Sequence, residues 1–211
     1  MTHPLSLSSL PLFPLEAVLF PGGVLSLRVF EVRYLTMVRK CHEAGAPFGV
    51  VCLQTGTEVR RAEAPADQFC NVGTLAHVES LESPQPGLLL ARCMGSTRFE
   101  VQRSTQLAGG LWVADVVQRD ADPEIAVPEH LGAAALALEP VLAHLRELHG
   151  ERAVAASALN PMADSGWIAN RWCELLPMPL PLRQRMMELD SPLIRLELVG
   201  DMLDRTGIAP E

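Results

Sequence analysis

Apolar residues in the first half of the chain fall in short runs of the length and spacing that predict β-strands. These runs cover residues 12–15, 24–30, 48–53, 72–81, 88–94, 98–103 and 111–117. Turn signals separate them, notably Pro21-Gly22-Gly23 and Gly109-Gly110. Gly95 divides 88–94 from 98–103, so these runs form either a strand pair or one bent strand. The polar stretch 54–71 is predicted to be a long exposed loop.

One helix interrupts this β-rich half. Over residues 31–44 the apolar side chains change to a helical period, with Tyr34, Leu35, Val38 and Cys41 on one face. Gly45 follows where a helix favours a residue without a Cβ atom. The pattern therefore predicts a helix of about three turns between the second and third strands.

Helical spacing dominates the second half. A first helix is expected over 131–148, and Pro140 is expected to kink or divide it. Asp164 or Ser165 is expected to cap a second helix, which carries Trp167 and Trp172 on its apolar face. A third is expected to open at Pro181, and a fourth at Ser191-Pro192 with its end at Gly207.

The predicted fold class is therefore α+β, with a β-rich domain over 8–120 and a helical bundle over 125–208. The connection 120–128 is only nine residues long and contains two prolines. The apolar helices also need a partner surface, so the bundle is expected to pack on the β half. Residues 54–71 and 118–128 are candidate edges of a binding groove at that junction.

Composition and net charge limit the kinds of molecule that the chain is expected to bind. The chain has 211 residues, of which 48% are hydrophobic, and a net charge of -8, which disfavours DNA and RNA as partners. The first residues lack the pattern of a signal peptide, and no run of 18 apolar residues offers a membrane span. A cytoplasmic location is the expectation. The five cysteines are widely scattered, which favours reduced, buried thiols over disulfides or zinc ligands.

Motifs for catalysis are missing from the sequence. Lys40 is the only lysine and is followed by Cys41, so neither a phosphate-binding loop nor a Ser–Lys peptidase pair is expected. Asp164-Ser165-Gly166 is interpreted as a helix cap and not as a nucleophile motif. The six histidines have no metal-ligand spacing, so the expectations are no enzyme activity, no cofactor and no metal. The two tryptophans at 167 and 172 are more plausible as core than as an aromatic cage.

The succession of motifs resembles the N-terminal, substrate-binding domain family of Lon proteases. The resemblance is strongest over residues 11–41, in Leu12-Phe13-Pro14-Leu15, Leu19-Phe20-Pro21-Gly22 and Phe30-Glu31-x-Arg33-Tyr34. Further matches are Phe48-Gly49-Val50-Val51, Val72-Gly73-Thr74-Leu75-Ala76, Gly95-x-x-Arg98-Phe99 and, in the tail, Ser191-Pro192 and Arg195-Leu196. The match runs from about residue 10 to 203 and contains neither ATPase nor peptidase motifs, as in a stand-alone member.

The resemblance implies a PUA-like β-barrel followed by a helical bundle. Among the matching residues, Phe30 and Tyr34 are expected in the core, and Arg33 and Arg98 are expected to be either buried ion-pair partners or ligand-binding residues. The resemblance also implies a non-catalytic module that binds unfolded or tagged polypeptides, for example as an adaptor in protein quality control. RNA or small-ligand binding by a PUA-like protein is the alternative, and a small-molecule enzyme with an unrecognised site is a third hypothesis. The sequence identifies no substrate-binding residues and no oligomeric state.

Overall fold

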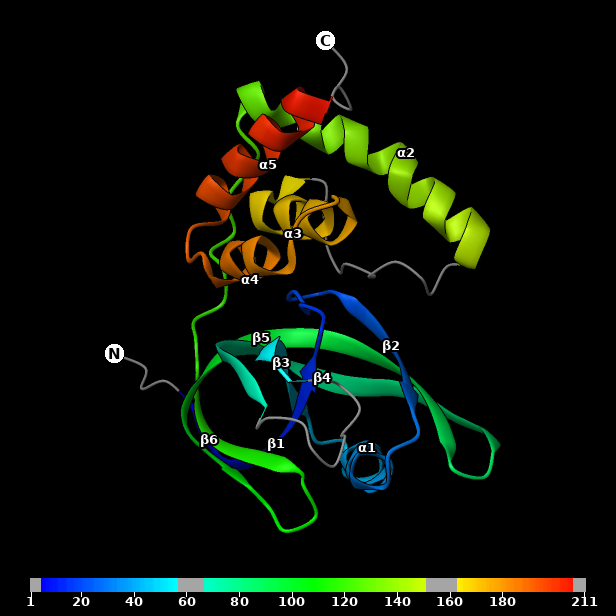
Figure 1. The fold of residues 1–211 in the computed structure, drawn as a ribbon. Helices are drawn as coiled ribbons and strands as arrows, with labels where there is room; N and C mark the ends of the chain where they lie inside the picture. The colour runs from blue at the N-terminus through cyan, green and yellow to red at the C-terminus, as the bar shows by residue number, and fades with distance from the viewer. Residues whose placement is uncertain (1–4, 57–66, 151–162, 207–211) are drawn as a thin grey trace. The chain divides into compact units, whose positions relative to one another are not determined.

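The computed structural model describes residues 5–56, 67–150 and 163–206, and it has a mixed α+β fold. The chain divides into two compact units, Met1–Ala121 and Asp122–Glu211. Unit 1 contains every strand and one helix, whereas unit 2 is helical (Figure 1). No helix in the described ranges is both long enough and apolar enough to span a bilayer.

Unit 1 is built on one six-stranded sheet in the order β2-β5-β4-β3-β1-β6, with an additional pairing between β5 and β6. The strands are β1 (Ser6–Leu15), β2 (Val24–Val29), β3 (Phe48–Thr55), β4 (Gln68–Gln85), β5 (Leu88–Gln106) and β6 (Trp112–Gln118). β1 and β3 are parallel, and the other pairs are antiparallel. β2 therefore stands at one end of the strand order, where it pairs with β5.

The predicted bend at Gly95 lies inside one long strand, so the second of the two sequence alternatives is correct. Before Gly95, β5 pairs with β2 over Leu89–Met94, and after it β5 pairs with β6 from Phe99 onward. A Cβ atom at Gly95 would lie 2.4 Å from the Phe20 carbonyl oxygen, so the close approach of backbone requires glycine. Gly95 thus allows β5 to bend, so that β5 pairs with β2 before the bend and with β6 after it.

Helix α1 (Val32–Ala44) covers part of the sheet, as the sequence predicts. Tyr34, Met37, Val38 and Cys41 are its buried residues, and Gly45 ends it with a left-handed φ of 61°. The expectation that Phe30 belongs to the core is wrong, because Phe30 is 55% exposed. It comes directly after β2, before the helix begins, and neither element turns its side chain inward.

The loop predicted over 54–71 is shorter than expected. β3 extends to Thr55 and β4 begins at Gln68, because the polar residues at these ends pair through their main chains. Backbone pairing does not require apolar side chains, so the polarity of this stretch misled the prediction. Residues 57–66 lie outside the described part of the chain.

Unit 2 contains a short 3-10 turn, η1 (Glu129–Leu131), and the helices α2 (Gly132–His149), α3 (Ser165–Leu175), α4 (Leu180–Glu188) and α5 (Pro192–Thr206). The predicted caps are confirmed: an Asp164 carboxylate oxygen accepts from the Trp167 amide at 2.8 Å, and Ser191 Oγ accepts from Ile194 at 3.3 Å. α2 continues through Pro140 as one helix. The end predicted at Gly207 lies outside the described residues.

The interior of unit 2 contains a charged side chain that the sequence pattern did not single out as buried. Arg195 on α5 is 1% exposed. Its guanidinium donates to both carboxylate oxygens of Asp122, to the Asn170 side-chain oxygen at 2.8 Å, and to the carbonyls of Met186 and Leu189. One side chain thus joins the start of unit 2 to α3, to α4 and to the residue that follows α4.

The cysteines are free thiols, as predicted, and Cys41, Cys52, Cys93 and Cys173 are buried. Burial raises the pKa of both the Cys93 and the Cys173 thiol to about 12, and it also raises the pKa of Cys41. Since the thiolate is the reactive form, these thiols are expected to resist iodoacetamide at pH 8 in the native protein. Partly exposed Cys70 is expected to be alkylated first.

Peptide mass spectrometry after timed alkylation checks this order, and a urea-unfolded sample is the control in which all five cysteines should react. Alkylation of Cys93 or Cys173 as fast as Cys70 in the native protein would contradict the burial seen here.

Candidate functional site

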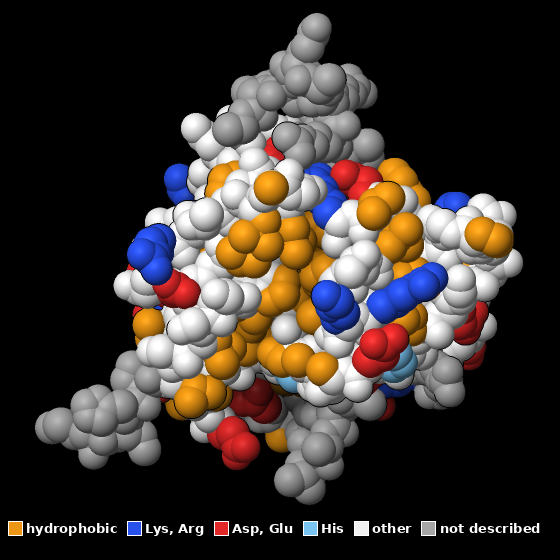
Figure 2. Space-filling model, turned by 90° about the horizontal axis from the view of Figure 1, so that it is seen from below, with side chains coloured by type: hydrophobic (Ala, Val, Ile, Leu, Met, Phe, Trp, Pro, Cys, Tyr) orange, Lys and Arg blue, Asp and Glu red, His pale blue; other side chains and the backbone are white. Residues whose placement is uncertain are grey.

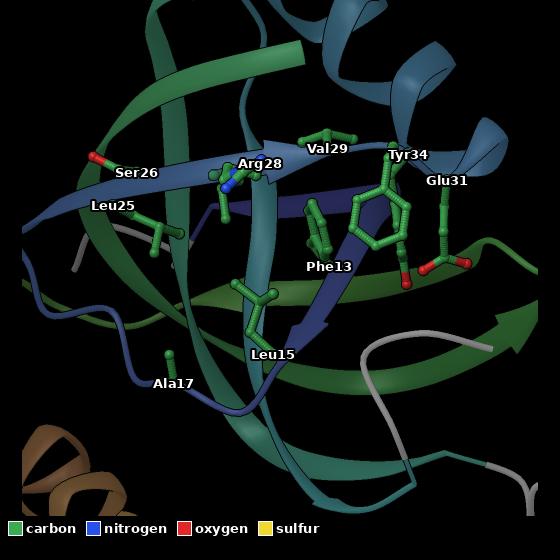
Figure 3. A pocket seen from close by; sticks show the side chains of 11 residues that line it. Phe13, Leu15, Ala17, Leu25, Ser26, Arg28, Val29, Glu31 and Tyr34 are labelled. Carbon is green, nitrogen blue, oxygen red and sulfur yellow. The ribbon is translucent and has the colours of Figure 1, made fainter. Parts of the chain in front are cut away.

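A pocket of about 370 Å³ lies in unit 1 between β1, the residues that follow it, and β2 (Figure 3). Its volume lies in the range of about 300–1,000 Å³ that is typical of ligand sites. Most of its lining is apolar: Phe13, Leu15, Ala17, Leu25, Leu27, Val29, Phe30 and Tyr34. Ser26, Arg28 and Glu31 are the polar residues of the lining.

Two stacked aromatic rings form one wall of this pocket. Phe13 on β1 and Tyr34 on α1 stack with ring centroids 4.0 Å apart and planes 15° apart. Figure 3 labels both side chains at the pocket. Phe48 also packs against Phe13, at 6.2 Å. The wall is thus fixed by residues of β1, β3 and α1, so the pocket has a rigid apolar side.

Arg33 holds the start of α1 in place beside the pocket. Its guanidinium lies over the Tyr34 ring at 4.4 Å, its Nε donates to the Glu31 carboxylate at 3.0 Å, and its Nη1 donates to the Gly110 carbonyl at 2.7 Å. The last bond ties the turn between β5 and β6 to α1. The ion pair expected for Arg33 is therefore present, and the Arg33 side chain is only 7% exposed.

Exposed apolar side chains surround these segments. Phe30 and Val32, at the start of α1, are 55% and 79% exposed, and Leu107, in the β5–β6 turn, is 48% exposed. On the face of unit 1 that carries α1, apolar side chains form a broad patch, with several charged groups among and beside them (Figure 2). An exposed patch of this kind next to an apolar pocket is typical of a surface that binds another molecule.

A second hollow, of about 380 Å³, lies in unit 2 between α5 and the segment formed by η1 and α2. It is rich in acidic groups, with Glu197, Asp201 and Asp204 beside His130. No group of three or more His, Cys, Asp or Glu residues suited to a metal is found among the described residues. The pocket in unit 1 is therefore the better candidate site.

The structure also places the residues that the sequence analysis considered and set aside. Lys40 is exposed on α1, and the histidines of the described segments are exposed as well. Trp172 is buried and donates its indole N–H to the Ala134 carbonyl at 2.9 Å, so its assignment to the core is confirmed. Trp167 is half-buried, with Arg171 over its ring at 5.6 Å.

Sequence reasoning missed the pocket. The described residues of the candidate edges, 54–56, 67–71 and 118–128, do not contribute to its lining, and the motif residues Phe30 and Tyr34 were assigned only structural roles. The one available signal was Phe30-Glu31 at a strand–helix junction, where a large apolar residue stands outside the period of both elements.

Comparison with known proteins gives three concordant results. The family model of the ATP-dependent protease La (LON) substrate-binding domain matches residues 9–205. Among curated proteins the chain is 26% identical to Lon protease 2 of Myxococcus xanthus over 199 residues and 25% identical to Lon protease of Anaeromyxobacter dehalogenans over 198 residues. These matches cover 93% of this chain but only 23% of each relative.

Solved structures agree. A Lon N-terminal domain protein from Xanthomonas campestris superposes with a TM-score of 0.70 at 31% identity, covering 92% of this chain and 98% of that one. The N-terminal domain of Mycobacterium avium complex Lon protease gives a TM-score of 0.54 at 14% identity over 92% and 96% of the two chains, which shows a shared fold.

Proposed function

Because the chain belongs to the family of the Lon substrate-binding domain, we propose that it binds segments of unfolded polypeptides in the apolar pocket between β1 and β2 and that it does not cleave them. The observation that carries the proposal is the position of that pocket. It lies beside the exposed side chain of Phe30, on the surface of unit 1.

The chemistry of the pocket supports a polypeptide ligand. Its lining is chiefly aliphatic and aromatic, and its polar members do not form a constellation for proton transfer or nucleophilic attack. Unfolded chains expose the apolar side chains that such a lining accommodates, whereas folded proteins bury most of them. The proposal therefore includes selectivity for unfolded over folded proteins.

Phe30→Ala is expected to weaken binding of an unfolded protein by tenfold or more. Large aromatic side chains at the centre of an interface often contribute 2 kcal/mol or more to binding, and about 1.4 kcal/mol is tenfold. Reduced, carboxymethylated α-lactalbumin is a suitable unfolded probe, and calorimetric titration measures its affinity. Since Phe30 is 55% exposed, the substitution should leave the melting temperature nearly unchanged.

Leu136→Ala is the matched control, because Leu136 is an exposed apolar residue of unit 2, 70% exposed. It should leave the affinity unchanged. Equal affinity of the wild-type chain for native and for carboxymethylated α-lactalbumin, or no binding of either, would refute the proposed function.

The closure of the sheet and the bounds of the two domains also belong to the proposal. We propose that the sheet is a PUA-like barrel, which the β5–β6 pairing supports, and that the domains extend over 8–120 and 125–208. We also propose that the chain acts in the cytoplasm as an ATP-independent adaptor in proteolysis, and its membership of the Lon substrate-binding domain family supports this role.

A further inference from the structure

Building on the proposed function, we infer that the polypeptide binds as an added β-strand on the free edge of β2, with every second side chain in the pocket. The preferred segment is apolar at alternate positions and acidic at a position beside Arg28. The inference thus names the conformation and the charge of the ligand.

The first support is the position of β2 in the sheet. Among the described strands it pairs with β5 alone, so its other edge carries main-chain groups that no described strand bonds. Such an edge is a template for another strand. The pocket lies along this edge, because five consecutive residues from Leu25 to Val29 line it (Figure 3).

The ladder between β2 and β5 identifies which groups point outward. Gly95 accepts a main-chain hydrogen bond from Gly22 at 2.9 Å and donates one to the Gly23 carbonyl at 2.8 Å. Antiparallel ladders alternate between bonded and non-bonded pairs, and Val24 faces Met94 next along the strand. The alternation therefore directs the N–H and C=O groups of Ser26 and Arg28 toward the free edge.

The side chains of β2 fit the same arrangement. Leu27 and Val29 are buried, whereas Ser26 and Arg28 are exposed. A strand added at this edge would continue the pleat, with its apolar side chains on the inward face beside Leu25 and Leu27 and its polar side chains outward. Apolar pockets for alternate side chains are the usual source of specificity in strand addition.

The charge near the pocket explains the preference for an acidic residue in the ligand. Among the described residues of the lining, Arg28 and Glu31 are charged, and Glu31 is paired with Arg33 at 3.0 Å. Arg28 thus leaves a local positive charge on a chain with a net charge of -8. A carboxylate on the outward face of the added strand would lie near it and complement this charge.

The test uses a fluorescein-labelled nine-residue peptide in which leucine alternates with threonine, with one central threonine replaced by glutamate. Two versions carry N-methyl groups, one at the leucines and the other at the threonines and glutamate. Anisotropy titration with the full chain should show that one version loses tenfold or more in affinity while the other keeps it, because only alternate N–H groups face β2. Loss at the polar positions indicates antiparallel addition, and loss at the leucines indicates parallel addition.

Equal affinities of the two methylated versions would overturn strand addition. Arg28→Glu tests the charge preference, with a second peptide that carries lysine in place of the glutamate. The wild-type chain should prefer the glutamate peptide by about threefold or more at low salt, and Arg28→Glu should reverse this preference. An unchanged preference would overturn the role of Arg28.

Competition by carboxymethylated α-lactalbumin distinguishes a failure of strand addition from a failure of the proposed function. If it binds and Phe30→Ala weakens it, but the methylated peptides bind equally, the proposed function holds and strand addition fails. If neither the competitor nor any peptide binds, the proposed function itself fails.

Discussion

Replacing Arg195 with alanine is expected to destabilise unit 2 by about 3–5 kcal/mol, the cost typical of removing one partner of a buried ion pair. Arg195 is 1% exposed, and its Nη1 lies 2.5 Å from an Asp122 carboxylate oxygen and 2.8 Å from the Asn170 oxygen. Without it the Asp122 carboxylate, of which 15% is exposed, loses its counter-charge, and the carbonyl of Met186 loses a donor. Isolated domains of this size are stable by only about 5–15 kcal/mol, so the loss is a large fraction of the total.

Urea titration followed by tryptophan fluorescence measures this effect. In a Trp112→Phe background the remaining tryptophans, Trp167 and Trp172, both lie on α3, so the signal reports on unit 2. Arg185→Ala is the matched control, since Arg185 is an exposed arginine of α4 and its loss should cost less than about 0.5 kcal/mol.

A double variant tests whether charge pairing is the cause. Replacing Arg195 with methionine and Asp122 with leucine removes both charges together and should recover part of the stability lost in Arg195→Met alone. If Arg195→Ala unfolds at the same urea concentration as Arg185→Ala, the network does not stabilise unit 2 and the interpretation is wrong.

Phe99→Ala is expected to cost unit 1 about 3–5 kcal/mol, toward the upper end of that range. The ring is fully buried, and it lies close to the backbone of Gly49 on β3 and of Gly73 on β4. A Cβ atom at Gly49 would lie 2.7 Å from Phe99 Cζ, and one at Gly73 would lie 2.6 Å from the same atom. Neither glycine has a side chain that could move into the cavity that alanine leaves, so only the other members of the core cluster, such as Leu12 and Leu75, could fill part of it.

Phe30→Ala is the matched control for this substitution, because the same atoms are removed from a side chain that is 55% exposed. Differential scanning calorimetry of the two variants should show a large fall in the melting temperature of unit 1 for Phe99→Ala and almost none for Phe30→Ala. Together the pair separates residues that stabilise the sheet from residues that bind. Similar melting temperatures for both would show that the cavity around Phe99 collapses freely.

Local features of this protein were readable from the sequence. The caps at Asp164 and Ser191, the apolar face of 31–44 and its end at Gly45 were all predicted, because each depends on residues within one turn or one element. The order of motifs from residue 11 onward likewise indicated the Lon substrate-binding family without any information from the tertiary structure.

The position of the candidate site could be identified only from the tertiary structure. Phe30 was assigned to the core by analogy, yet its exposure depends on where β2 ends relative to the start of α1. The pocket exists because Phe13 on β1, Leu25 on β2 and Tyr34 on α1 meet in space, and no spacing along the chain encodes that meeting. Arg195 shows the same limit, since its position in a helical pattern gives no sign of its bonds to Asp122, 73 residues away. Periodicity reports which face of an element is apolar, whereas the partner of that face is set by long-range packing.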